Sequence, residues 1–360
     1  MVRAPQPLHL AVEIDGAGGH PAAWRVWGRP PADVLSPRIL RSVVDTAEAA
    51  GFALVTIDDR VVPGEGAYPV GRLDAGTRAS FVATTTASIG VAPTVQALTT
   101  EPFHLATQLA SLDHGSRGRA AWVVGSDNSA DVNGAVGFEP RAPEAVQREV
   151  RDVIELARQL WDSWEDDAVI RDAATGRYLD PDKVHHVGFE GEFFSVVGPL
   201  ITPRSPQGQI VVVGAAELGV TDLLDIVLLS GRDVTEIGTS ATGQQAVTLA
   251  DVEVILDTKT ESAQSRLARL DGYSPWPDRG RLRFAGSARD FVDLVRSLAD
   301  KVDGVRIHPA VVTTDLAVLV DEVLPVLQEL SLHRIPKPGS TLRETLGLPR
   351  PLSRFTSTTN

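Results

Sequence analysis

The stretch SIGVAPTVQALTTEPFHLATQLASLDHGSRGRAAWVVGS, residues 88–126, decides the fold predicted for this chain. Its apolar runs Ile89–Val95 and Ala120–Val124 predict two buried strands. The segment PFHLATQLASL between them predicts a helix, opened by a proline whose missing N–H costs nothing in a first turn. Two strands that bracket one helix form a βαβ unit, which is typical of a parallel sheet. Ligands of such sheets bind beyond the carboxyl ends of the strands, so Thr94 and Ser126 are candidate site residues.

Apolar runs of strand length recur along the whole chain and alternate with helical patterns. We expect eight strands, near residues 8–14, 53–57, 89–95, 120–124, 210–213, 226–229, 252–256 and 305–308. This alternation predicts an α/β fold of the (β/α)8 TIM-barrel class. The segment 184–197 alternates like a β-hairpin, and we expect it outside the barrel. Since no internal repeat or long low-complexity linker interrupts the pattern, we expect residues 1–360 to form a single domain.

The composition excludes several classes of function. The chain carries 34 basic and 47 acidic residues, a net charge of −13, which argues against nucleic acid and anionic membranes as partners. It has no cysteine, hence no disulfide or thiolate site, and no zinc-ligand spacing, so we expect no metal. The sequence shows no signal-peptide core and no apolar run of membrane-spanning length, so we expect a cytoplasmic protein.

Several motifs occur in order along the chain. They are LHLAVEIDGAGGHPAAWR (8–25), APTV, TEPFH, LASLDH and GRAAWVVGS (within 88–126), LWDSWEDDA (160–168), DPDKVHHVGFEGEFFSVVGPLITPRSPQG (180–208) and GSTLRETLGLPRP (339–351). Together they resemble the luciferase-like flavin-dependent monooxygenases, in the branch of the nitrilotriacetate and dibenzothiophene-sulfone monooxygenases. The resemblance implies a TIM barrel with a hairpin insertion. Relatives usually carry a long helical insertion after the seventh strand, where this chain has only residues 257–280.

The resemblance also implies a reaction and its partners. In this family, reduced flavin mononucleotide (FMN) comes from a separate flavin reductase, and the bound flavin activates O2 to oxidise a small organic substrate. Some relatives bind a deazaflavin instead, and the family implies a homo-oligomer. The alternative hypothesis is a flavin-poor, non-catalytic member of the family that serves as a binding or assembly partner.

The resemblance points to particular flavin-binding residues. Asp58 or its neighbour Asp59, after the second strand, and Thr94, after the third, match positions that contact the flavin in relatives. Ser126, after the fourth strand, and backbone N–H groups around Gly214, after the fifth, are further candidates for binding the cofactor.

Two histidines are candidate substrate-binding residues. His20 lies on the first loop, and His104 lies in the first turn of the helix after the third strand. The alternative for each is a packing or capping role. We expect Asp58, Thr94, Ser126 and His104 to converge at the mouth of the barrel.

Four positions depart from the flavin-binding pattern of the family. Relatives have an Asn in the fourth strand, a His and a Tyr at the start of the long helix, and a Ser after the fifth strand. At these positions the chain has Val123, Pro143, Gln147 and Ala216. Losing four contacts of about 1 kcal/mol each would weaken binding roughly a thousandfold. We expect Val123 and Ala216 to line a less polar cavity, and Arg232 either to replace the lost serine or to lie on the surface.

Overall fold

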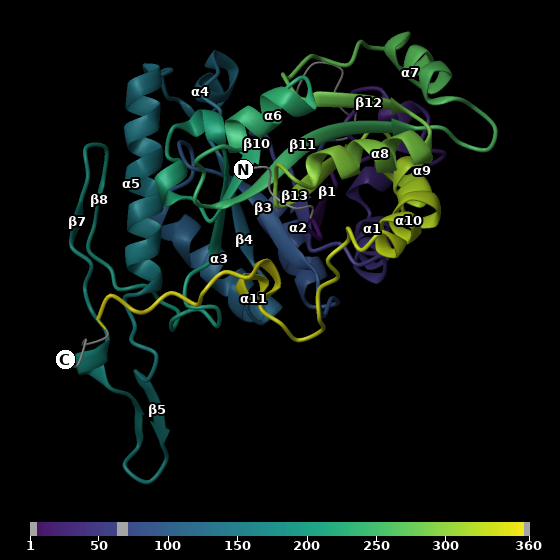
Figure 1. Ribbon diagram of the computed structural model, residues 1–360. Helices are drawn as coiled ribbons and strands as arrows, with labels where there is room; N and C mark the ends of the chain where they lie inside the picture. Colours follow the sequence, from purple (N-terminus) through teal and green to yellow (C-terminus); the bar gives the residue numbers. More distant parts are fainter. Residues whose placement is uncertain (1–5, 63–70, 356–360) are drawn as a thin grey trace.

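The computed structural model describes residues 6–62 and 71–355, and its centre is a barrel of eight parallel strands (Figure 1). The strands follow the order β10-β9-β4-β3-β2-β1-β13-β11, and β10 pairs with β11 to close the barrel. All eight predicted strands are confirmed. They are β1 (His9–Glu13), β2 (Leu54–Ile57), β3 (Gly90–Gln96), β4 (Ala121–Gly125), β9 (Val211–Ala215), β10 (Ile226–Leu229), β11 (Val247–Leu256) and β13 (Gly304–Pro309).

Strand β11 is longer than predicted, because the sequence indicated only its second half, 252–256. One edge of β11 pairs with β13. Its other edge pairs with β10 through Val247–Ala250 and, further up, with β12 (Leu282–Gly286). This ninth strand was not predicted, because the charged sequence RLRF has no long apolar run. Strand β12 extends the sheet at the carboxyl end of β11, outside the closed ring of eight strands.

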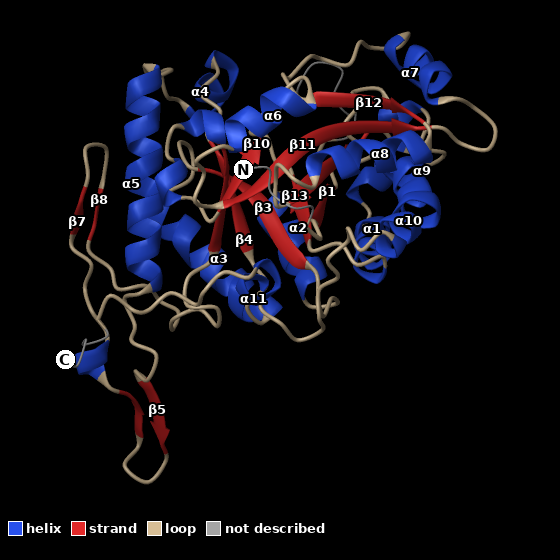
Figure 2. Cartoon of the chain, in the orientation of Figure 1, coloured by secondary structure: helices blue, strands red, loops and turns tan. Residues whose placement is uncertain are grey.

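Helices surround the barrel and bury their apolar sides against it (Figure 2). A π-helical turn, Leu319–Val323, joins α9 to α10. The helices are α1 (Pro37–Ala49), α2 (Ala75–Ala83), α3 (Pro102–Ser116), α4 (Ala130–Val136), α5 (Pro143–Trp161), α6 (Val234–Ala241), α7 (Ala263–Asp271), α8 (Ala288–Leu298), α9 (Val312–Val318), α10 (Leu324–Glu329) and α11 (Leu342–Leu346). No helix among the described residues is both long enough and apolar enough to cross a membrane.

The inside of the barrel is apolar at the amino ends of its strands. Leu342 and Leu346 of α11 pack with buried interior side chains such as Leu54 and Leu249. Gly90 is required here, because a Cβ at this position would lie 2.7 Å from Leu342. Helix α11 therefore closes the barrel at the amino ends of its strands, and a site is expected at the carboxyl ends.

Two antiparallel hairpins project from the barrel, near α5 (Figure 1). The predicted hairpin is confirmed as β7 (Phe189–Glu190) paired with β8 (Ser195–Val196). The second consists of β5 (Val169–Asp172) and β6 (Arg177–Leu179), where the charged sequence indicated only a surface segment. Neither hairpin contributes a strand to the barrel.

Candidate active site

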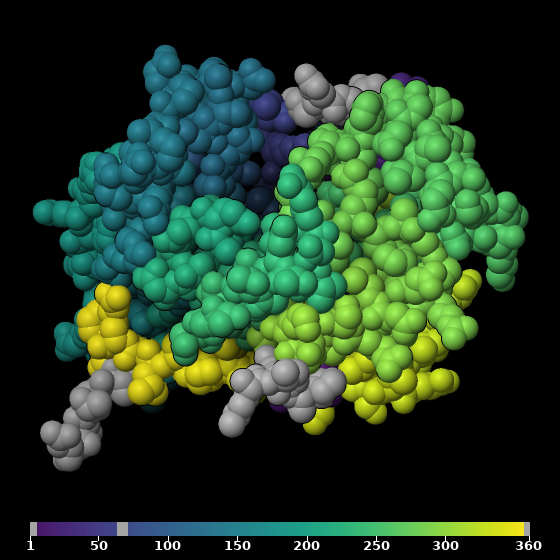
Figure 3. All heavy atoms as spheres, turned by 45° about the horizontal axis from the view of Figure 1, so that its top comes forward, coloured from purple at the N-terminus to yellow at the C-terminus, as the bar shows by residue number. Residues whose placement is uncertain are grey.

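Two adjoining cavities of about 560 and 390 Å³ open at the carboxyl ends of the barrel strands. In the space-filling view they lie in a hollow between blue and green segments, with purple N-terminal residues deep inside (Figure 3). The first cavity lies over β1, β2 and β3, and the second extends toward β4, β9 and β10. The residues that line both are Glu13, Asp58, Asp59, Arg60, Thr94, Gln96 and Arg279.

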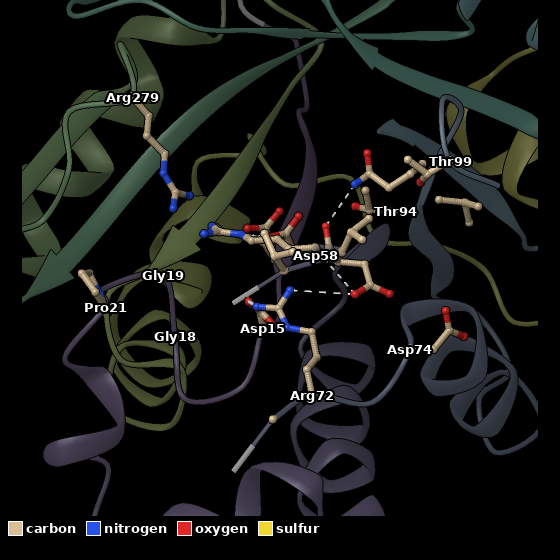
Figure 4. Close-up of a pocket in the computed structure, with 18 of the residues that line it drawn as sticks. Asp15, Gly18, Gly19, Pro21, Asp58, Arg72, Asp74, Thr94, Thr99 and Arg279 are labelled. Carbon is tan, nitrogen blue, oxygen red and sulfur yellow. Dashed lines mark hydrogen bonds and ion pairs between the residues drawn. The ribbon is translucent and has the colours of Figure 1, made fainter. Parts of the chain in front are cut away.

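The two aspartates after β2 differ in their contacts. Asp59 accepts hydrogen bonds from the backbone N–H of Ala75 at 2.6 Å, at the start of α2, and from that of Arg60 at 2.9 Å. Burial raises the pKa of Asp59, although these bonds oppose the shift. The Asp58 carboxylate pairs with Arg60 at 3.3 Å. Asp59 therefore holds the loop, while Asp58 lies at the centre of the cavity (Figure 4).

Thr94 and Gln96 project from β3 into both cavities. The Gln96 amide donates to the Asp59 carbonyl at 3.3 Å and accepts from the Asp127 N–H at 3.1 Å. Gly125 makes room for this amide, because a Cβ there would lie 2.6 Å from it. The Thr94 hydroxyl has no hydrogen-bond partner among residues 6–62 and 71–355, so it is available to a ligand.

Asp15, just beyond β1, is a cavity residue that the sequence analysis missed. It pairs with Arg72 at 2.7 Å and with Arg78 at 3.5 Å (Figure 4). Burial raises the pKa of Asp15 to about 6, helped by the nearby Asp58 and opposed by the two arginines. Its carboxyl group can therefore take up or release a proton near neutral pH.

A buried ionic network forms one wall of the barrel interior and reaches the cavities through Glu13 and Arg306. The imidazole of His308 lies between carboxylates, with Nδ1 2.9 Å from Glu13 and Nε2 3.2 Å from Asp251. Arg306 donates twice to Asp251, both times at 2.6 Å. These partners hold the pKa of Glu13 and of Asp251 well below the usual range, although burial opposes the shift. The carboxylates of this charged wall therefore remain ionised.

The other wall is apolar. Val123 of β4, Val213 of β9 and Leu228 of β10 pack in one interior cluster. Val123, Leu228 and Ala215 also line the second cavity. The candidate site is thus a concave space with one charged and one apolar wall, which is suited to a partly apolar ligand with polar edges.

A family model described as "Luciferase-like monooxygenase" matches residues 18–223, more than half of the chain. The chain belongs to this family. Among curated relatives it is 28% identical to N-acetyl-S-(2-succino)cysteine monooxygenase of Bacillus subtilis (strain 168), over 99% of this chain and 100% of that protein. It is 32% identical to nitrilotriacetate monooxygenase component A of Aminobacter aminovorans, over 59% of this chain and 50% of that protein.

Solved structures agree with the luciferase-like fold. Long-chain alkane monooxygenase (LadA) aligns with a TM-score of 0.83 at 20% identity, covering 96% of each chain. EDTA monooxygenase (EmoA) from Chelativorans sp. BNC1 aligns with a TM-score of 0.78 at 20% identity, covering 96% of this chain and 99% of that one. At such low identity these likenesses establish the fold and do not assign a substrate.

The predicted cofactor residues of this luciferase-like chain are only partly brought together. Asp58 and Thr94 line both cavities, and Ser126 lines the second. Gly214 is buried on the outer side of β9, where a Cβ would lie 2.8 Å from Leu218. Its neighbour Ala215 faces the cavity instead, because successive residues of a strand point to opposite faces.

The two predicted substrate histidines differ in their placement. His20 lines the first cavity but is buried, and its Nε2 lies 3.1 Å from Asp271 while its Nδ1 accepts from the Ala22 N–H at 3.0 Å. His104 is exposed on α3 and does not line either cavity. The structure therefore does not bring His104 together with Asp58, because the helix carries it away from the strand ends.

The residues that depart from the family pattern also differ in where they lie relative to the cavities. Val123 lines the second cavity as expected, whereas Ala216 does not. Gln147 donates to the Gly219 carbonyl at 2.6 Å, so its amide is engaged within the protein. Arg232 is exposed and pairs with Asp278 at 3.2 Å, which agrees with the surface alternative.

The cavities fit the two ends of FMN differently. The first is large enough for a planar ring, and the polar groups of Asp58 and Thr94 are available along it. Near the ends of β4 and β9, the described side chains include the acidic Asp127 and Glu217 and the apolar Ala215. The single 3-10 turn Ala216–Leu218 is too short to act as a helical phosphate site. The first cavity therefore accommodates the flavin ring, whereas the ends of β4 and β9 lack a strong binding site for the phosphate of FMN.

Proposed function

We propose that this chain is a flavin-dependent monooxygenase that oxidises a small organic molecule with O2, using reduced FMN delivered by a separate flavin reductase. The observation that carries the proposal is the group of Asp58, Thr94 and Gln96 around a ring-sized cavity in a luciferase-like barrel. Relatives named as monooxygenases support the reaction class. Cytoplasmic location, a homo-oligomer and a single domain remain predictions.

The chain's own residues would orient and shield a bound ring. The Thr94 hydroxyl can donate to a carbonyl oxygen, and the Asp58 carboxylate can accept from an N–H group. Val123 and Leu228 exclude water from one side, while Asp15 can exchange a proton at the opposite side. A bound reduced flavin supplies the electrons for O2 activation, and the protein positions substrate and cofactor.

Flavin titration tests this proposal. FMN and a deazaflavin are titrated into the full chain, followed by reduced FMN from an added reductase with O2 consumption as readout. We expect micromolar FMN binding, and Thr94→Ala should weaken it about tenfold through loss of a hydrogen bond. His104→Ala, at an exposed position outside the cavity, is the matched control. Absence of binding at millimolar FMN in both oxidation states would refute the proposal.

The second candidate function is a non-catalytic binding or assembly partner of an active relative. Val123, Ala215 and Glu217 favour it, because two apolar side chains line the second cavity at β4 and β9 and an acidic residue follows β9, where a flavin phosphate would need donors or cations. In that case the titration yields no flavin complex, while the chain co-purifies with an active family member.

A further inference from the structure

Arg279 reaches the cavities from the segment that precedes β12. Its side chain points toward the centre of the site, on the side opposite Thr94 (Figure 4). Arg281 and Arg283 share one face of the extended segment that leads into β12, and Gly280, with a φ of 69°, bends the chain between them and Arg279. Two of these arginines meet carboxylates of β11: Arg281 pairs with Asp251 at 3.3 Å and Arg283 with Glu253 at 2.7 Å.

Arg279 has no such partner. Among the described residues that line the cavities, every carboxylate has an ion pair or a hydrogen bond. The contacts are Glu13–His308, Asp15–Arg72, Asp58–Arg60, Asp59–Ala75, Asp74–Thr77 and Asp127–Ser129. The guanidinium of Arg279 makes no hydrogen bond or ion pair with any residue in 6–62 or 71–355.

Arg279 is exposed at the open mouth of the site, and charges of both signs lie near it. Partial burial and the neighbouring Arg60 and Arg281 lower the pKa of Arg279, while Asp58 and Glu13 oppose the shift. A bound anion would relieve this repulsion, and a guanidinium presents a planar fork of donors that matches an oxyanion. Arg279 also lines the second cavity together with the apolar side chains of Val123 and Leu228, so a ligand there could contact apolar side chains with one part and the cation with an anionic part.

We propose that Arg279 binds an oxyanion group of a small molecule held in these cavities. The inference deepens the proposed function, on which it rests, by assigning the ligand a carboxylate, sulfonate or phosphate. Two sources share this chemistry: an acidic organic substrate and the phosphate of FMN. The second source would give the cofactor a phosphate contact from the segment before β12 instead of from the ends of β4 and β9.

The test compares Arg279→Gln and Arg279→Lys with the wild-type chain. Arg279 makes no hydrogen bond within the part of the chain that the structure describes, so these variants should keep the fold, which circular dichroism checks. The probes are FMN, riboflavin (which lacks the phosphate), inorganic phosphate and succinate, each titrated by calorimetry. Arg232→Gln is the control, because Arg232 is an equally charged residue on the exposed surface.

The outcomes identify the source of the anion. For a phosphate contact, Arg279→Gln loses about tenfold in FMN affinity and nothing in riboflavin affinity. For an acidic substrate, FMN affinity stays constant and succinate affinity falls about tenfold. Arg279→Lys should recover only part of either loss, because the lysine ammonium lacks the planar pair of donors with which a guanidinium binds an oxyanion. Equal affinities of wild type and Arg279→Gln for all four probes would overturn the proposal.

This design separates failure of the anion site from failure of the monooxygenase proposal. If the wild-type chain binds neither flavin, the monooxygenase proposal fails, and the succinate and phosphate titrations still decide the role of Arg279. If it binds FMN and riboflavin but shows no anion dependence on Arg279, only the anion site fails.

Discussion

The two walls of the barrel mouth have opposite chemistry although they lie on one closed sheet. On one side, Glu13, Asp251, Arg306 and His308 form a buried ionic network. On the other, Val123, Val213 and Leu228 pack as an ordinary apolar core. Both sets come from inward-facing positions of parallel strands, so strand geometry alone does not determine the polarity of the interior. The difference shows that the buried charged groups of the barrel interior are confined to the half formed by β1, β13 and β11.

The largest effect should come from breaking the charged wall. Asp251→Asn would remove the carboxylate to which the buried Arg306 donates twice and leave it only the longer contact to Glu13 at 3.4 Å, and breaking a buried ion pair costs about 3–5 kcal/mol. We expect a loss of that size in the unfolding free energy, measured with urea. Asp222→Asn is the control, because the exposed Asp222–Arg151 pair contributes about 0–1 kcal/mol. Equal losses in the two variants would contradict the importance of the buried network.

The pH dependence of the unfolding free energy tests the charged side of the mouth further. Because the pKa of Asp15 is raised to about 6 in the fold, ionising it there costs free energy, and stability falls as the pH rises from about 4 to 6. A shift of about two units corresponds to about 3 kcal/mol. In Asp15→Asn, the change in unfolding free energy between pH 4 and pH 7 should differ from that of the wild type by this amount.

The matched control for this pH measurement is Asp45→Asn, an exposed position on α1. It should preserve the wild-type pH dependence. If Asp15→Asn also preserves it, the carboxyl group of Asp15 titrates normally and its assignment as a proton-exchanging group is wrong.

The apolar wall can be tested by adding the missing polar group. Val123 lines the second cavity, so Val123→Asn should place an amide near a bound flavin and tighten FMN binding about fivefold. Ala216→Ser should have no effect, because Ala216 does not line either cavity. Fluorescence titration measures both. Tighter binding in Ala216→Ser alone would show that the phosphate lies at the end of β9 after all.

The smallest effect should come from a residue outside both walls. His104 is exposed on α3, so His104→Ala should change FMN affinity and unfolding free energy by no more than about 0.5 kcal/mol. A larger loss of FMN affinity, measured in the same fluorescence titration, would show that His104 contributes to flavin binding.

The sequence predicted the barrel well because its buried strands are apolar runs between helical patterns. It missed β12 and the hairpin β5–β6, whose charged residues resemble surface loops. Their pairing depends on long-range contacts, which a local pattern does not encode.

The sequence predicted cavity residues that lie near or just beyond strand ends, such as Asp58, Thr94 and Ser126. The positions of Asp15 and Arg279 depend on how loops and β12 fold over the mouth. One signal was present in the sequence: arginines alternate at 279, 281 and 283, and acids alternate at 251 and 253. Recognising it required knowing that β11 and β12 are neighbours.

Among the described residues, strand β12 pairs with β11 alone, and the eight barrel strands close without it. Strand β12, which carries Arg283, and the segment before it therefore lie outside the closed barrel. The segment 257–286 can therefore differ in length or charge without opening the ring of barrel hydrogen bonds, provided that the buried Asp315, which pairs with Arg266, keeps a partner. Such differences would change the side chains at the mouth while the order of the barrel strands stays the same.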